Sequence, residues 1–334
     1  MLPAGKLPIK LLERLLKKYT GGGKRVVVGP SVGIDSAVID FKDTYLLAKT
    51  DPITFVAEDI GSYAIEINAN DIAVMGGTPK WFLATLLLPA GRTTFETVEG
   101  IFAALSGSCR RLGVAFCGGH TEITPGIDRP IVVGQMLGEV SRGRLITGAG
   151  ALQGDDIILT KGIAIEAVSV IARTFTGELE KTFPAAYLKR CRDFIKRPGL
   201  SVVKDALTAC KYGEIHAMHD PTEGGLSTGL YEIALASDCG IIIERAIPLF
   251  PETKRLCSHF GLDPMGCIAS GALVLTVAMK DTQKVLRGLK KAHIPAWRIG
   301  RVTGKKEGLR VAGKKRTSPL KLFERDELTR LFRK

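Results

Sequence analysis

The sequence of 334 residues lacks a long apolar run. The longest candidate, residues 267–279, is shorter than the roughly 20 residues that a membrane-spanning helix needs, and Ser270, Gly271 and Thr276 interrupt it. The start of the sequence does not have the shape of a signal peptide, because lysine, arginine and glutamate interrupt its leucines. We therefore expect a cytoplasmic protein with no membrane partner.

Metal-binding and disulfide patterns are also missing. The seven cysteines include no CxxC pair and their number is odd, which argues against a structural zinc site and against a disulfide framework. None of the five histidines belongs to an HExxH pattern, so a zinc hydrolase is disfavoured. We expect most of the cysteines to be small core residues in a reducing compartment.

Familiar phosphate-binding loops are absent as well. Gly21-Gly22-Gly23-Lys24 is followed by arginine and lacks the GxxxxGK[ST] spacing. The sequence has no GxGxxG after a predicted strand and no GxSxG nucleophile elbow. A protein with this sequence that handles phosphates must therefore do so with other residues.

Positive charge is plentiful, and the formal net charge is +13. Much of the excess lies near the two ends, in residues 10–25 and 305–334. Aromatic residues are sparse at 6%, and no signature of an RNA- or DNA-binding module accompanies the charge. We interpret the charge as a solvated basic surface and expect no nucleic-acid partner.

The length and the mixed order of predicted elements favour two domains of α+β architecture. The first domain, residues 1–150, begins with a flexible part, residues 1–24, which holds an amphipathic helix at 5–19 and the glycines 21–23. A turn-rich passage from 147 to 156 separates it from a second domain, residues 151–312, and a basic tail, residues 313–334, contains a predicted helix at 319–332. Further strands are predicted at 26–28, 36–41, 45–49, 81–88, 114–117, 131–140 and 157–160, and helices at 59–75, 94–112 and 165–175.

Three acidic residues lie where carboxylates can bind Mg²⁺ and, through it, phosphate. Asp35 lies in a turn before a predicted strand, Asp51 follows one, and Asp71 lies with Asn70 on a helix that is otherwise apolar. The alternative is capping, because aspartate and asparagine at turns often bond to local backbone N–H groups. Asp71 fits that alternative least, since a charge on an apolar helix needs a partner.

Two glycine-bearing segments have the flexibility to approach a ligand closely. Gly118-Gly119-His120-Thr121-Glu122 follows a predicted strand, and its histidine and glutamate either bind phosphate or metal or cap the next segment. Residues 219–225, HDPTEGG, place an acid and a proline before a helix whose N-terminus would attract an anion. The functional and the capping interpretations stay open for both segments.

Taken in order, these segments resemble the family of aminoimidazole ribonucleotide (AIR) synthetase (PurM), the hydrogenase maturation factor HypE, thiamine-monophosphate kinase (ThiL) and selenophosphate synthetase. The resemblance is closest to HypE-like proteins, extends from about residue 29 to about residue 304, and rests on the order and spacing of motifs that are individually short. The motifs are 33–38 (GIDSAV, family GDDAAV), Thr50-Asp51, 70–76 (NDIAVMG, family NDLAVMG), 118–121 (GGHT, family GGDT or GGHT), 154–157 (GDDI) and 220–225 (DPTEGG).

The resemblance implies an AIR synthase-like fold. Its N-terminal domain would bind ATP and Mg²⁺ and pair with a second copy into a dimeric β-barrel, and its C-terminal domain would be an α/β sandwich. It implies an ATP-dependent phosphotransferase or ATPase that activates an oxygen of a small-molecule or peptide-borne acceptor. By motif match, the implied metal ligands are Asp35, Asp51 and Asp71; the implied cofactor-binding residues are Gly33, Asp35, Asn70, Gly118, Gly119 and Thr121; and the implied catalytic residues are Asp71, Asp220 and His120.

The sequence departs from the family pattern at several positions. HypE ends in a Pro-Arg-Ile-Cys tail, whereas this chain ends without cysteine; Ile34 stands where the family has a paired acid, and Glu223 where HypE has arginine. No cysteine precedes Cys109, which argues against selenophosphate synthetase. Two alternatives therefore remain: a small-molecule kinase like thiamine-monophosphate kinase, and a nucleotide-binding assembly or regulatory protein without turnover.

Overall fold

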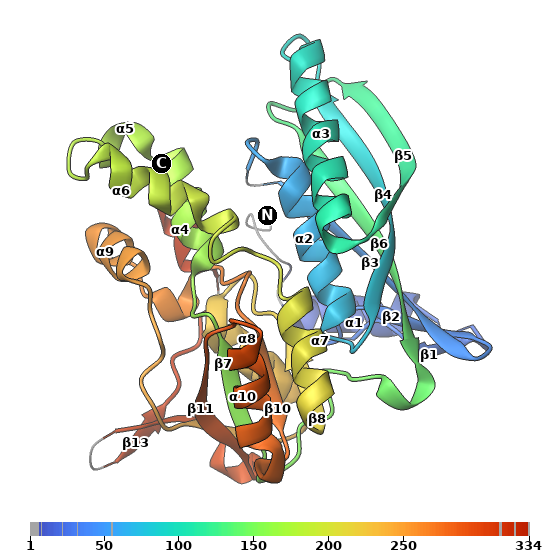
Figure 1. Cartoon of the computed structure of the whole chain (residues 1–334), viewed down its shortest axis with the longest axis vertical. Helices are drawn as coiled ribbons and strands as arrows, with labels where there is room; N and C mark the ends of the chain where they lie inside the picture. The colour runs from blue at the N-terminus through green and yellow to red at the C-terminus, as the bar shows by residue number, and fades with distance from the viewer. Residues whose placement is uncertain are drawn as a thin grey trace.

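Two mixed β-sheets organise the chain, one built from its first half and one from its second (Figure 1). The structure is a computed structural model, and it describes residues 7, 9–21, 23–31, 33–54, 56–313, 316–323 and 325–332. Helices pack against both sheets, so the chain has the expected α+β architecture with two sheet-centred units. No described helix is long and apolar enough to cross a membrane.

The first sheet has six strands in the order β1-β2-β3-β6-β4-β5. Only β4 and β5 pair in parallel; the other neighbours are antiparallel. The strands are β1 (Val26–Val28), β2 (Ala37–Phe41), β3 (Thr44–Ile53), β4 (Thr78–Pro89), β5 (Ala115–Thr124) and β6 (Ile131–Ser141), and α1 (Ile9–Tyr19) precedes them.

Two helices of different character cover one face of this sheet (Figure 1). The α3 helix (Phe95–Leu112) is amphipathic; the Thr94 hydroxyl accepts a hydrogen bond from the Thr97 N–H at its start, and Gly113 ends it with a φ of 69°. The α2 helix (Ile60–Ala73) is buried along almost its whole length, because it packs against the sheet, against α3 and against α7 (Val203–Tyr212) of the second half. The polar residues Glu66, Asn68, Asn70 and Asp71 of α2 are consequently buried too.

The second sheet has seven strands in the order β13-β12-β9-β11-β7-β10-β8, and only β12 and β9 pair in parallel. The strands are β7 (Asp156–Thr160), β8 (Ile215–His219), β9 (Gly240–Ile243), β10 (Val274–Val277), β11 (Ala296–Thr303), β12 (Leu309–Ala312) and β13 (Thr317–Pro319). The remaining helices are α4 (Ile165–Thr174), α5 (Thr176–Leu179), α6 (Ala185–Arg192), α8 (Gly225–Ala236), α9 (Pro251–Phe260) and α10 (Thr282–Lys291). In Figure 1, α4, α5, α6 and α9 gather to one side of this sheet.

Most elements expected from the sequence are present, with boundaries that shift by a few residues. The predicted helix at 5–19 is found over Ile9–Tyr19, and its first residues lie outside the described part of the chain. The predicted helix at 319–332 is wrong: β13 ends at Pro319, and only a 3₁₀ helix, Glu327–Phe332, follows. The strand expected at 114–117 continues to Thr124, so it contains the whole Gly118–Glu122 segment.

Candidate functional site

Four aspartates from separate elements converge in the structure, and we refer to them as the acid cluster. Asp35 lies in the turn before β2, Asp51 in β3, Asp71 in α2, and Asp220 directly after β8. The four carboxylates lie close enough to act together on the buried ammonium of Lys49. That Asp35, Asp51 and Asp71 together bind a metal stays a prediction; Asp51 lies within a strand and not after it.

Lys49 faces one half of the acid cluster, formed by Asp51 and Asp71. Its Nζ lies 3.3 Å from Asp71 Oδ2 and 3.9 Å from Asp51 Oδ2. Lys49 and Asp51 are two residues apart in β3, so the strand alternation places both on the same face. Burial disfavours the ammonium, but the carboxylates of Asp71 and Asp51 outweigh this and raise the pKa of Lys49 above its ordinary value.

His219 faces the other half, formed by Asp35 and Asp220. Its Nδ1 lies 3.1 Å from Asp35 Oδ1, and its Nε2 lies 2.9 Å from Oε2 of Glu232 in α8. Burial alone would lower the pKa of His219, but the carboxylates of Asp35 and Glu232 raise it well above its ordinary value. Asp35, His219 and Asp220 offer ligand atoms that lie within 4.8 Å of one another.

A glycine fixes the position of Asp35. Gly33 has a φ of 78°, and a Cβ atom there would lie 3.0 Å from the backbone oxygen of Glu232 and 3.1 Å from the Ala236 side chain. Because only glycine combines this φ with such a close approach, the turn can rest against α8. That contact places Asp35 beside His219, across the boundary between the two halves of the chain.

The acid cluster has unused ligand capacity. Within the described part of the chain, neither carboxylate oxygen of the buried Asp220 has a hydrogen-bond partner, nor does Oδ2 of Asp71. Burial, with the Asp35 carboxylate, raises the pKa of Asp220 to about 7, and burial raises the pKa of Asp71 well above its ordinary value. Asp71 Oδ2 still has the ion pair with Lys49, whereas the Asp220 carboxylate has no ion pair with a described residue, and such oxygen ligands fit a hard divalent cation such as Mg²⁺.

Asn70 links the two halves of the chain. Its Nδ2 donates a hydrogen bond to the backbone oxygen of Leu200 at 2.9 Å, and its Oδ1 accepts one from the Val202 N–H at 2.7 Å. The side chain is completely buried. The structure thus gives the amide of Asn70 two backbone partners next to the acid cluster, a role that the motif alone did not indicate.

The Gly118–Thr121 segment lies apart from the acid cluster in its contacts. It is in β5, the edge strand of the first sheet, where it pairs with β4. A Cβ atom at Gly119 would come within 1.8 Å of the Ala84 backbone oxygen, so this glycine permits close strand packing. The His120 side chain is 70% exposed with Nε2 3.7 Å from Glu122, and no hydrogen bond or ion pair of the described residues joins the segment to the acid cluster.

The N-terminus of α8 already holds an anion. The Asp326 carboxylate accepts hydrogen bonds from the backbone N–H groups of Gly224 and Leu328, both at 2.8 Å. Burial raises the pKa of Asp326 to about 7, and it does the same for the nearby Glu166 carboxyl in α4. The helix begins at Gly225, four residues after Pro221. The expected anion is thus a side chain of the C-terminal segment.

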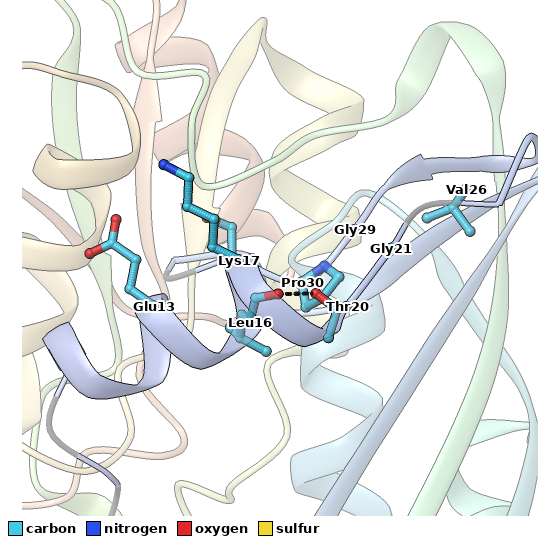
Figure 2. A pocket seen from close by; sticks show the side chains of 9 residues that line it. Glu13, Leu16, Lys17, Thr20, Gly21, Val26, Gly29 and Pro30 are labelled. Carbon is cyan, nitrogen blue, oxygen red and sulfur yellow. Dashed lines mark hydrogen bonds between the residues drawn. The ribbon is translucent and has the colours of Figure 1, made fainter.

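A cavity of about 470 Å³ lies between α1 and the loop that leads to Asp35 (Figure 2). Its lining residues are Glu13, Leu16, Lys17, Thr20, Gly21, Val26, Gly29, Pro30 and Ser31. Figure 2 shows Glu13 and Lys17 side by side on α1, with the Thr20 hydroxyl donating to the Leu16 backbone oxygen at 2.6 Å. Gly29, Pro30 and Ser31 of the cavity lie a few residues before Asp35 in the sequence.

The sequence reasoning missed Lys49, His219 and Glu232. Two of them carried a signal, since Lys49 is two residues before Asp51 in a strand and His219 directly precedes Asp220. Glu232 carried none, because it lies in mid-helix and meets His219 only through the tertiary fold.

The fold and this arrangement of residues define an AIR synthase-type protein, and the chain belongs to the AIR synthase related family. Residues 33–140 match the N-terminal domain of AIR synthase related proteins, and residues 153–312 match their C-terminal domain.

Curated relatives come from hydrogenase maturation. A putative hydrogenase expression/formation protein of Methanocaldococcus jannaschii is 29% identical over 84% of this chain and 84% of its own length. The carbamoyl dehydratase HypE of Cupriavidus necator is 29% identical over 75% of this chain and 70% of its own length.

Solved structures share the fold. HypE in a HypE–HypF complex superposes with a TM-score of 0.77 at 20% identity, covering 94% of this chain and 99% of that one. HypE in complex with ATP gives a TM-score of 0.72 at 22% identity, covering 94% and 91%, and ThiL complexed with AMPPCP and TMP gives 0.71 at 22%, covering 93% and 94%. These likenesses establish the two-domain fold.

Proposed function

We propose that this protein is an ATP-dependent phosphotransferase or ATPase that activates an oxygen of a small-molecule or peptide-borne acceptor. The observation that carries the proposal is the acid cluster, whose buried carboxylate oxygens lack hydrogen-bond partners at Asp71 and Asp220. Support comes from the relatives: a HypE structure contains ATP, a ThiL structure contains AMPPCP and TMP, and curated relatives are carbamoyl dehydratases.

In this proposal Asp35, Asp51 and Asp71 hold the Mg²⁺ that arrives together with the nucleotide, and this ion would neutralise charge on the triphosphate. Asp220 would serve as a further acid at the site, and His219 keeps Asp35 oriented through its ion pair. Residues 1–150 would carry nucleotide binding, with Gly33 at the site and Gly118, Gly119, His120 and Thr121 contributing to the phosphate end. Catalysis would then consist of positioning and charge neutralisation.

Two other functions have specific support. A thiamine-monophosphate kinase-like activity is favoured by the fold shared with ThiL, and consumption of thiamine phosphate with ATP would identify it. Nucleotide binding without turnover is favoured by Ile34, which supplies no carboxylate beside Asp35, and it predicts binding without release of ADP.

The proposed function is tested by calorimetric titration of the full chain with AMPPCP, with and without Mg²⁺. We expect saturable binding that requires Mg²⁺, followed by ADP release from ATP once the acceptor is supplied. Absence of AMPPCP binding in the presence of Mg²⁺ would contradict the proposal in all three forms.

We also propose that the protein is a cytoplasmic homodimer, in which two first sheets pair into a barrel. Helices α2 and α3 cover one face of that sheet (Figure 1). The other face presents half-exposed apolar side chains such as Leu83, Leu87 and Leu137. The edge strand β5 is exposed along most of its length, and its Ile123 is 54% exposed. A protein partner is a further proposal, supported by the HypE–HypF complex.

Sedimentation at micromolar concentration should show a dimer-sized species. Replacing Ile123 with lysine should shift this species towards monomer. Replacing the exposed Phe41 with lysine serves as a comparison, because Phe41 lies in β2, towards the edge of the sheet opposite to β5. A parent that sediments only as a monomer would contradict the barrel.

A further inference from the structure

Lys49 brings a fixed positive charge into a place that the sequence assigned to metal. Its ammonium lies between two carboxylates of the acid cluster, 3.3 Å from Asp71 and 3.9 Å from Asp51. The side chain is 22% exposed, and the Asp71 side chain only 6%. An ammonium held at these distances occupies the space from which a metal ion would bridge the same two carboxylates.

The charges around the site divide into two groups. Asp51 and Asp71 face Lys49, whereas Asp35 and Glu232 face the imidazole of His219. Asp220 has no protein cation within ion-pair distance among the described residues, and both its oxygens lack hydrogen-bond partners. The greatest uncompensated ligand capacity is therefore on the Asp220 side, next to Asp35.

We propose that Lys49 is the resident cation of the Asp51–Asp71 half, so that a divalent ion arriving without nucleotide binds at the Asp35–Asp220 half alone. The proposal rests on the proposed function only in taking the acid cluster as a divalent-cation site. It makes Lys49 a positioning residue that holds Asp51 and Asp71 in place. Lys49 also sets how many divalent ions the acid cluster binds without nucleotide.

The physical basis is charge repulsion and occupied space. A divalent ion placed between Asp51 and Asp71 would have to displace the ammonium or lie beside it at a few ångströms, where like charges repel strongly. Replacing Lys49 with a neutral side chain of similar length removes both obstacles and leaves two carboxylates without a cation. Such a variant gains a second ion site, whereas a lysine with a purely structural role would not change the count.

The test is the stoichiometry of Mn²⁺ binding to the full chain without nucleotide, measured by the electron paramagnetic resonance signal of free Mn²⁺. We expect one Mn²⁺ per chain for the parent and for Lys49→Arg, and two per chain for Lys49→Gln. The added site of Lys49→Gln should fill at a Mn²⁺ concentration about tenfold below the concentration at which Mn²⁺ binds non-specifically to the parent. Lys80→Gln is the matched control, because it removes the same charge from an exposed position in β4 and should leave the count at one. An unchanged count and affinity in Lys49→Gln would overturn the proposal.

A second pair of variants keeps the test decisive if Lys49→Gln does not fold. Asp51→Asn should leave the single Mn²⁺ of the parent in place, because that ion does not use the Lys49 half, whereas Asp35→Asn should remove it. Loss of Mn²⁺ from Asp51→Asn with retention in Asp35→Asn would refute the assignment. Titration with AMPPCP reports separately on the proposed function, which can fail while the ion count still decides the role of Lys49.

Discussion

Asp71→Asn should weaken the binding of AMPPCP with Mg²⁺ about a hundredfold, a loss on the order of 3 kcal/mol. Asparagine keeps the shape of the side chain but removes the negative charge that a divalent ion requires at this position. The folded protein should lose little stability, because burial raises the pKa of Asp71 despite the nearby Lys49, so the ionised carboxylate is costly to keep in the folded state. Lys49 retains Asp51 as a partner in the variant.

Calorimetry and thermal unfolding of the same preparations would measure both effects. Asp43→Asn is the matched control, since it makes the same chemical change in an exposed hairpin turn and should alter neither quantity. Equal affinities in Asp71→Asn and the parent would refute a metal role for Asp71. A large drop in unfolding temperature with unchanged affinity would show that the carboxylate has a structural role instead.

Asn70→Ala should have the largest effect on stability, a loss of about 2–4 kcal/mol in the free energy of unfolding. The substitution leaves the Leu200 carbonyl and the Val202 N–H buried without their partner, and each unsatisfied group carries its full desolvation cost. It also breaks a connection between α2 and the segment before α7, so the two halves of the chain should move more freely relative to each other.

Denaturant unfolding at pH 7 would measure this loss. Gln153→Ala, which removes an exposed amide of the same chemical type, should change the free energy of unfolding by less than about 0.5 kcal/mol. A loss no larger in Asn70→Ala than in the control would contradict the linking role. Asn70→Asp adds a further comparison, because it keeps the acceptor for Val202 but replaces the donor to Leu200 with an acidic oxygen at a buried position.

The main elements of the fold were predictable because their signals are local. The α3 helix combines an apolar stripe with a capping Thr94 and a terminating Gly113, and each of these can be read from neighbouring residues. The extension of β5 through Gly118 and Gly119 could not be predicted in this way. Glycine pairs usually end a strand, and here the close approach of the Ala84 backbone keeps the strand together. The prediction of a C-terminal helix failed because a distant contact shapes this segment. The Asp326 carboxylate accepts a hydrogen bond from the N–H of Gly224, about a hundred residues earlier in the chain.

The acid cluster was predictable in part. Asp35, Asp51 and Asp71 could be found because acids stood out beside glycines or on an apolar helix, and the resemblance supplied their common purpose. The cations that face them were missed, because the positions of Lys49 two residues before Asp51 and of His219 directly before Asp220 are weak signals that do not by themselves show a contact. Only the tertiary fold shows that Lys49 and His219 neutralise the cluster from two sides.

The acid cluster draws its members from both halves of the chain: Asp35, Asp51 and Asp71 precede the second sheet, whereas Asp220 directly follows its strand β8. An ion coordinated by Asp35 and Asp220 together would link the half of the chain that holds the first sheet to the half that holds the second. The affinity of the site for the ion and the relative orientation of the two halves are then thermodynamically coupled, so that a change that separates the two halves also releases the ion.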